Sequence, residues 1–311
     1  MRIALAAVAA ITVLPPWLAP RLGFAPEVTT LPRAGRAVPI GDQRELHVVE
    51  HGAGSPVVLV HGLPSNIGDW GDVPVRLAAR GHHVVVYDRI GYGGSSAAPV
   101  RGDAYTFASS ARDLVALLDA LALPRAALVG WSYGGGVVQV LARRAPERVS
   151  QMVLLAAVGP TFDDVPRSTL DRVLHSPAAL PLLRWVAAIP PLSRAAMRST
   201  LAGLFSDPAA IPPGLIERSR AQLALPGTLE AFVAESVQMD SASLAPERIS
   251  APTLVVSGSD DRSVPIAVAE DLARRIPGAE LVRVEGGSHM LPITHAELLA
   301  ETLHEWLERT R

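Results

Sequence analysis

The chain has 311 residues, of which 49% are hydrophobic, so it can bury a core of the size found in large globular domains. Its formal net charge of -2 supplies no basic surface for nucleic acid, and we expect no nucleic-acid partner. Cysteine is absent, which excludes disulfides, thiolate nucleophiles and cysteine-ligated metals.

The segment from Ile3 to Pro20 carries no charge and lies between Arg2 and Arg21. Such an apolar stretch suits the core of an export signal, and it just reaches the length of a membrane anchor. Three alternatives stay open: an uncleaved membrane anchor, a cleaved export signal, or an apolar arm of a cytoplasmic protein. We assign residues 1–35 to this segment and its linker, and membrane association through residues 3–20 follows from the first alternative.

From residue 36 short apolar runs alternate with longer amphipathic ones, which predicts a mostly parallel sheet with crossover helices. The strands are predicted at 44–52, 56–62, 82–91, 126–131 and 149–159, and the helices at 72–81, 105–123 and 135–145. Short Val/Leu runs bounded by glycine or proline suit strands that are covered on both faces.

The pattern changes after Gly159, because residues 160–246 contain many prolines and helical segments but no convincing strand. Strands resume at 251–258 and 279–287, and helices are predicted at 265–278 and 295–311. The sequence therefore predicts an α/β core formed by residues 36–159 and 247–311, with a helical insertion at 160–246.

Four glycines surround a serine in the run Gly130-Trp131-Ser132-Tyr133-Gly134-Gly135-Gly136. A buried strand precedes this run and a helix follows it, so the serine is predicted to lie on a sharp, strained turn that exposes its hydroxyl. The Gly-x-Ser-x-Gly pattern alone is weak evidence. Phosphate binding is disfavoured, because the pattern lacks the spacing and the lysine of a phosphate-binding loop.

A serine nucleophile needs a histidine base, and the base needs a carboxylate that orients it. Both residue types follow later strands: Asp260 and Asp261 come after the strand at 251–258, and His289 comes after the strand at 279–287. The order serine, aspartate, histidine at successive strand ends predicts a catalytic triad.

Four motifs together resemble the α/β-hydrolase superfamily, over about residues 40–310 outside the insertion. They are His61-Gly62-Leu63-Pro64, the run from Asp88 to Ser95, the turn at Ser132, and the run from Gly258 to Pro265. The resemblance implies an α/β-hydrolase fold with the insertion as a lid over the site. It also implies a serine hydrolase of the esterase or lipase type, with Ser132, Asp261 and His289 as catalytic residues.

Within this resemblance, Asp261 occupies the position of the family's acid, and the adjacent Asp260 is the fallback. The base lies in Gly-Gly-Ser-His-Met, which differs from the Gly-His-aromatic sequence of relatives and changes the expected pocket wall beside His289. Serine rather than aspartate at position 132 excludes the carboxylate chemistry of epoxide hydrolases and haloalkane dehalogenases.

The resemblance assigns the oxyanion hole to the backbone N–H groups of Leu63 and Tyr133. Asp88 and Arg89 are expected to fix the neighbouring loop by hydrogen bonds. Candidate pocket residues are Trp131, Met290, Trp185 and His61, although packing is the more usual role for a histidine placed like His61.

The insertion carries apolar side chains that would line a cavity or pack its own helices: Leu180, Leu182, Leu183, Trp185, Val186, Ile189, Leu192, Met197, Leu201, Leu204 and Phe205. Together they favour a small hydrophobic substrate, an acyl or aromatic ester. We expect the reaction to need no metal or organic cofactor.

Short motifs leave other functions open. The same triad could cleave C–C bonds in ring-fission products, or act as a cofactor-free perhydrolase of the haloperoxidase type. A ligand-binding receptor on the same fold is the non-enzymatic alternative. The remaining histidines, at 47, 51, 82, 83, 175, 295 and 304, are interpreted as surface or core residues, and no oligomeric state is indicated.

Overall fold

The computed structural model describes residues 34–99, 103–166 and 169–311, so the apolar segment at 3–20 lies outside the described residues. Among the residues described, we find no helix with the length and hydropathy needed to cross a membrane.

One eight-stranded sheet forms the centre of the molecule, with the strand order β1-β2-β4-β3-β5-β6-β7-β8. Strands β3 to β8 are parallel, whereas β2 runs antiparallel to both of its neighbours, β1 and β4. The strands are β1 (Arg36–Pro39), β2 (Glu45–His51), β3 (Ser55–Val60), β4 (His82–Tyr87), β5 (Ala126–Trp131), β6 (Val149–Leu155), β7 (Thr253–Gly258) and β8 (Glu280–Val284).

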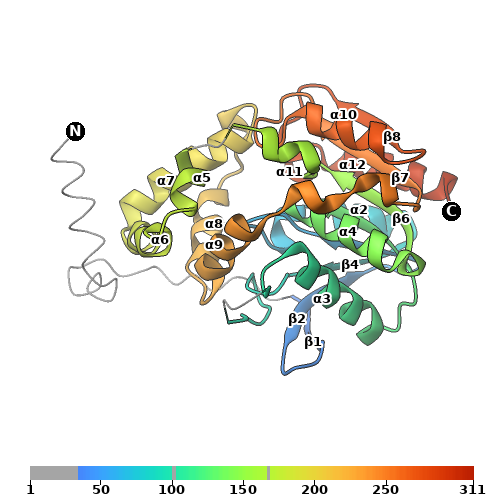
Figure 1. The fold of residues 1–311 in the computed structure, drawn as a ribbon, viewed down its shortest axis with the longest axis horizontal. Helices are drawn as coiled ribbons and strands as arrows, with labels where there is room; N and C mark the ends of the chain where they lie inside the picture. Colours follow the sequence, from blue (N-terminus) through green and yellow to red (C-terminus); the bar gives the residue numbers. More distant parts are fainter. Residues whose placement is uncertain (1–33, 100–102, 167–168) are drawn as a thin grey trace.

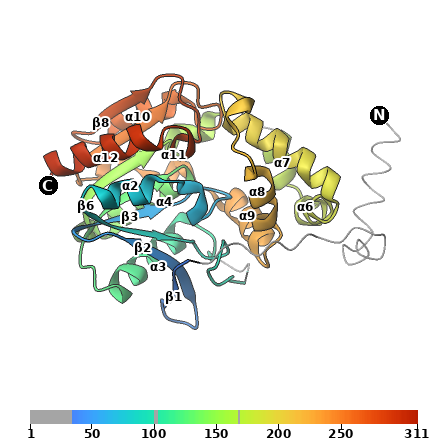
Figure 2. The ribbon, with the colours of Figure 1, turned by 180° about the vertical axis from the view of Figure 1, so that it is seen from behind.

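Helices cover both faces of this sheet (Figure 1 and Figure 2). One face packs against α3 (Phe107–Ala120), α4 (Tyr133–Arg144) and α10 (Ile266–Arg275), and the other against α2 (Val73–Ala79), α11 (Leu291–Thr294) and α12 (Ala296–Arg309). Because side chains alternate along a strand, Val58 and Leu128 join the first core while Val57 and Val129 join the second. The predicted mostly parallel α/β sheet is confirmed.

Between β6 and β7 the described residues form five α-helices and no strand. They are α5 (Thr169–Leu174), α6 (Ala179–Ala188), α7 (Pro190–Leu204), α8 (Leu215–Leu223) and α9 (Thr228–Gln238), with 3-10 turns at 160–164, 208–210, 241–244 and 246–248. Figures 1 and 2 show these helices gathered at one end of the sheet, beside the carboxyl ends of the parallel strands. We call residues 160–246 the helical insertion.

Several strands end earlier than predicted. The strand expected at 82–91 ends at Tyr87, and the strand expected at 149–159 ends at Leu155. Ala156 follows with a φ of 43°, a left-handed conformation that a strand cannot contain. The loops that follow β4 and β6 are also buried, so their sequences stay apolar beyond the last strand residue. The sequence pattern therefore does not separate a strand from the buried loop that follows it. The short β1 and the helix α8 were not predicted.

Glycines allow β5, α4 and β3 to approach one another closely near Ser132. A Cβ atom at Gly134 would lie 2.2 Å from the carbonyl oxygen of Val60 and 2.7 Å from that of His61. A Cβ at Gly130 would lie 2.5 Å from the carbonyl oxygen of Gly134. Since these three obstacles are backbone oxygens, no side-chain rotation can relieve the clashes, and the start of α4 depends on these glycines.

We therefore expect Gly134→Ala to lower the free energy of unfolding, measured in urea, by about 1–3 kcal/mol or more, as overpacking of a tight core does. The matched control is Gly203→Ala in α7, where an added Cβ meets nothing within 4 Å. There, alanine should leave stability unchanged or raise it by up to about 1 kcal/mol. Equal stability of Gly134→Ala and the wild type would contradict the close packing.

Candidate active site

Ser132 lies between the last residue of β5 and the first residue of α4, with a φ of 55° and a ψ of -118°. A non-glycine residue in this region carries strain of order 1–3 kcal/mol, so the surrounding contacts must hold it there. Its N–H donates to the Leu155 carbonyl at 3.0 Å, and its own carbonyl accepts from the Gly135 N–H at 2.9 Å. The predicted sharp turn is confirmed, and it places the hydroxyl at the positive end of α4.

His289 and Asp261 meet at the loops that follow β8 and β7. His289 Nδ1 lies 2.7 Å from Asp261 Oδ2, and the other carboxylate oxygen accepts the N–H groups of Ser263 and Val264 at 2.8 Å each. The Asp261 side chain is closed to solvent and the His289 ring is 7% exposed. In a neutral ring whose Nδ1–H donates to this carboxylate, the lone pair lies on Nε2.

Asp260 lies apart from this pair. It is exposed, and its carboxylate accepts from the neighbouring Ser259 hydroxyl at 3.0 Å. Of the two adjacent aspartates, Asp261 is therefore the one that contacts the imidazole.

A cavity of about 360 Å³ lies between the strand ends and the helical insertion, and both Ser132 and His289 line it. Its floor comes from the loops after β3, β5 and β8, and its roof comes from α5 to α9. Apolar insertion residues dominate the roof: Leu174, Leu183, Val186, Ala187, Met197, Leu201, Leu204, Leu215, Leu229 and Phe232.

The proposed pocket residues divide into two groups. Trp131 and Met290 line the cavity, whereas His61 and Trp185 do not. Trp131 also donates its ring N–H to the His289 carbonyl at 3.1 Å, a contact that fixes the loop carrying the imidazole. Of the apolar insertion residues named from the sequence, those outside the cavity lining are Leu180, Leu182, Trp185, Ile189, Leu192 and Phe205.

The loop after β3 presses against the serine. A Cβ atom at Gly62 would lie 3.0 Å from Ser132 Cβ, and the next residue, Leu63, lines the cavity. Tyr133 is the first residue of α4, so its N–H has no acceptor within the helix. Its ring is buried away from the cavity and lies in tilted contact with Phe107.

His61 holds this loop rather than facing the cavity. Its Nδ1 lies 2.9 Å from the Gly62 carbonyl oxygen, and its Nε2 accepts the Arg89 N–H at 2.9 Å. Burial and the neighbouring Arg89 cation lower the pKa of His61 well below its ordinary value, so the ring stays neutral. Both ring nitrogens of His61 therefore form hydrogen bonds with backbone groups.

Arg89 and Glu235 form a buried ion pair between the core and α9. The Arg89 side chain is 2% exposed and that of Glu235 1%, and the guanidinium contacts both carboxylate oxygens. Arg89 also donates to the carbonyls of His61 at 3.2 Å and Gly62 at 2.9 Å. Burial disfavours the charged guanidinium, but the adjacent carboxylate raises the pKa of Arg89 above its ordinary value.

Further contacts fix the loop after β4. Asp88 accepts the N–H groups of Ile67 and Gly94 at 2.9 Å each and lies 2.8 Å from His47 Nδ1. The Thr228 hydroxyl of α9 donates to the Gly91 carbonyl at 3.0 Å. The expectation that Asp88 and Arg89 fix this loop by hydrogen bonds is confirmed.

A family model described as the alpha/beta hydrolase fold matches residues 55–296. The chain belongs to the α/β hydrolase family. It is 30% identical over 279 residues to 2-hydroxymuconate semialdehyde hydrolase of Pseudomonas putida, which covers 89% of this chain and 95% of that protein. It is 29% identical over 268 residues to rhodomycin D methylesterase DnrP of Streptomyces peucetius, with 81% and 90% covered.

Among solved structures, a bromoperoxidase from Bacillus anthracis superimposes with a TM-score of 0.73 at 26% identity, covering 88% of this chain and 100% of that chain. The names of these relatives differ in the reaction they state. The comparisons therefore support a hydrolase of the α/β type and leave its substrate open.

Sequence reasoning missed Glu235, although it contacts the loop beside the serine. It lies 146 residues from Arg89 along the chain, on a helix whose amphipathic pattern is ordinary. The only sign in the sequence was that Glu235 lies in a largely apolar run, 228–238. A carboxylate in such a run by itself indicates a side chain exposed to solvent.

We expect Glu235→Gln in this hydrolase to lower the free energy of unfolding by about 3–5 kcal/mol, because it leaves the Arg89 cation buried without its counter-charge. Urea unfolding measures the loss. The control is Glu230→Gln on the same helix, where the carboxylate contacts Arg184 with side chains 29% and 46% exposed. That exposed pair should contribute less than about 1 kcal/mol. Equal losses in the two variants would contradict the role of the buried pair.

Proposed function

We propose that this protein is a serine hydrolase that cleaves hydrophobic carboxylic esters, with an acyl or aromatic group, through an acyl-enzyme on Ser132. The observation that carries the proposal is the buried Asp261–His289 pair, whose imidazole lines the same cavity as the strained Ser132 at the start of α4. This is the arrangement that activates a serine hydroxyl in unrelated hydrolases.

In the proposed mechanism, His289 Nε2 takes the proton of the Ser132 hydroxyl as the oxygen attacks the ester carbonyl. The Leu63 and Tyr133 N–H groups donate to the developing oxyanion, and Asp261 stabilises the imidazolium through Nδ1–H. The tetrahedral intermediate then collapses, His289 passes its proton to the departing alcohol oxygen, and the acyl group stays on Ser132. Water, deprotonated by the same imidazole, attacks the acyl-enzyme. The imidazolium then returns its proton to the Ser132 oxygen as the acyl bond breaks, so the acid departs and the serine hydroxyl is regenerated.

The cavity supports a neutral, apolar substrate. Its roof is mostly apolar, and among the lining residues that the structure describes only Arg220 carries a guanidinium. That group donates to the Ser193 hydroxyl at 2.8 Å and contacts the Glu217 carboxylate. The lining also carries the carboxylates of Asp69, Asp171 and Glu217, so carboxylates outnumber the one guanidinium. The charge balance thus favours an ester over an anionic substrate.

The first test is hydrolysis of p-nitrophenyl esters from acetate to palmitate by the full-length chain, with Ser132→Ala as the control. We expect wild-type turnover with an optimum at short to medium acyl chains, as a cavity of about 360 Å³ accommodates. Ser132→Ala should lose at least about 10³-fold in kcat while keeping its unfolding free energy near that of the wild type.

A fluorophosphonate probe separates the outcomes of that test. Labelling of Ser132 without ester turnover would replace the ester proposal with a narrower reaction on the same serine, and C–C bond hydrolysis would then come first. If the probe does not label Ser132 and no ester is hydrolysed, the proposal that Ser132 is an active nucleophile is contradicted.

The identity of the acid gives an independent prediction. Asp261→Asn should lower kcat by about 10³–10⁴-fold, because an amide cannot stabilise the imidazolium. Asp260→Asn, an adjacent change of the same kind at an exposed side chain, should alter kcat by less than a few-fold. Single-turnover kinetics of both variants on one ester would show the difference, and the reverse order would assign the acid to Asp260.

A further inference from the structure

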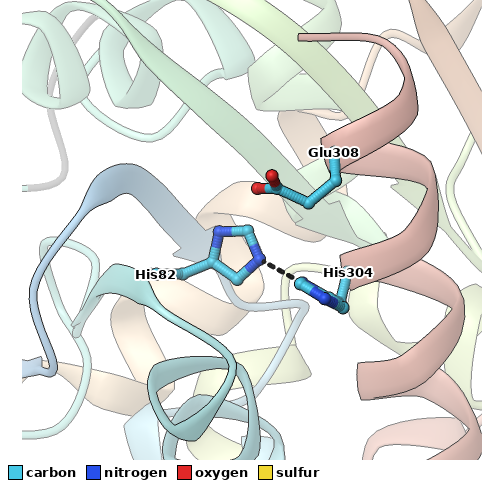
Figure 3. Close-up of side chains that lie close together, drawn as sticks. All are labelled: His82, His304 and Glu308. Carbon is cyan, nitrogen blue, oxygen red and sulfur yellow. Dashed lines mark hydrogen bonds between the residues drawn. The ribbon is translucent and has the colours of Figure 1, made fainter.

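Three side chains of types that can ligate a metal converge where β4 begins, beside the last turns of α12 (Figure 3). His82 is the first residue of β4, and His304 and Glu308 lie one turn apart on α12. The two nitrogens and the carboxylate oxygen that they offer all lie within 4.8 Å of one another. The spacing of four residues on α12 places His304 and Glu308 on one face of that helix.

The two imidazoles face each other through ring nitrogens. His82 Nε2 lies 3.0 Å from His304 Nδ1, and the rings are arranged edge to face with their centroids 5.2 Å apart. Without a metal ion, one of these nitrogens carries the proton of a hydrogen bond and the other accepts it. His82 is 1% exposed, and its Nδ1 has no hydrogen-bond partner among the described residues. The protein therefore does not fix which tautomer His82 adopts.

The spacing of the two imidazoles is close to that in a tetrahedral zinc site, whereas the Glu308 oxygen, which lies within 4.8 Å of them, would have to approach the ion by rotation of its side chain. Two imidazole nitrogens at 2.0–2.1 Å from Zn²⁺ stand about 3.3 Å apart at the tetrahedral angle, so the rings need to separate by only a few tenths of an ångström. The ring that donates the hydrogen bond must move its proton to its other nitrogen, and both rings must turn, because lone pairs that point toward each other across the hydrogen bond have to converge on the ion at the tetrahedral angle. Two histidines and one glutamate form a donor set that holds zinc with one open position for water.

One interaction competes with the ion. Arg311 donates to both carboxylate oxygens of Glu308, at 3.1 and 3.0 Å. This pair is exposed, with side chains 54% and 43% accessible, so it contributes little free energy. A divalent ion can displace Arg311, whose guanidinium is then free to turn into solvent.

We propose that His82, His304 and Glu308 bind one divalent transition-metal ion, with Zn²⁺ as the best match. The ion connects the end of α12 to the first residue of β4. Strands β4, β3 and β5 run parallel, His82 lies where β4 begins, and Ser132 lies where β5 ends. The cluster and Ser132 are therefore at opposite ends of the strands, which are about 20 Å long for six residues. The site is thus separate from the proposed hydrolysis and does not depend on it.

The test is Zn²⁺ binding to the full-length protein after removal of metals with a chelator. Isothermal titration should give one ion per chain at micromolar or tighter affinity, and Zn²⁺ should raise the Tm by a few degrees because it binds only the folded chain. With Co²⁺ as the probe, visible absorption should report coordination by nitrogen and oxygen ligands.

His304→Ala should abolish the binding, and Glu308→Gln should weaken it at least about tenfold. The matched control is Glu305→Gln, which removes the same charge from an exposed position on the same helix and should bind Zn²⁺ like the wild type. Ser132→Ala should also bind normally, since it lies at the other end of the strands. Absence of binding to the wild type, unchanged binding by His304→Ala, or equal losses in the Glu305 and Glu308 variants would each overturn the proposal.

Discussion

The buried pair of Arg89 and Glu235 organises the surroundings of Ser132. Removing two charges from water costs several kcal/mol each, and such a pair is tolerated only when further hydrogen bonds satisfy both groups. Here the carboxylate also accepts the Tyr92 hydroxyl at 2.7 Å, and the guanidinium holds the carbonyls of His61 and Gly62. The guanidinium carbon also lies 4.6 Å from the centre of the Tyr133 ring. One cation thus contacts both segments whose backbone N–H groups we propose for the oxyanion hole.

The same pair makes the helical insertion part of the site. Helix α9 supplies Glu235 and Thr228, and a Cβ atom at Gly91 would lie 2.5 Å from the Ala231 side chain, so the helix lies directly on the loop after β4. If the insertion moved so that α9 separated from this loop, the charges of Arg89 and Glu235 would lose each other as partners, whether they stayed buried or became exposed to water.

The sequence predicted the parts of the site that depend on local chemistry. Glycines around Ser132 indicate a strained turn because no other residue fits there, and Asp261 and His289 follow strands whose apolar runs are unmistakable. Contacts between distant elements were not predictable in this way. Glu235 occupies an ordinary helical position, and only the folded chain brings it to Arg89. Helical periodicity shows that residues such as Trp185 are apolar but not whether they face the cavity or a neighbouring helix. Strands were predicted too long where the loops that follow them are as buried as the strands.

Two buried histidines show why residue type alone does not indicate function. His61 follows the last residue of β3, and His82 is the first residue of β4, the strand beside it. Both side chains are buried. His61 has both ring nitrogens committed to backbone groups beside a cation, so it can neither gain a proton nor coordinate an ion without losing the loop that it holds. His82 directs one nitrogen at a second imidazole, and its other nitrogen has no hydrogen-bond partner within the part of the chain that the structure describes. The first arrangement satisfies the ring completely and makes it structural. The second keeps a lone pair that the backbone does not use, and a metal ion is the ligand that would satisfy both facing nitrogens at once.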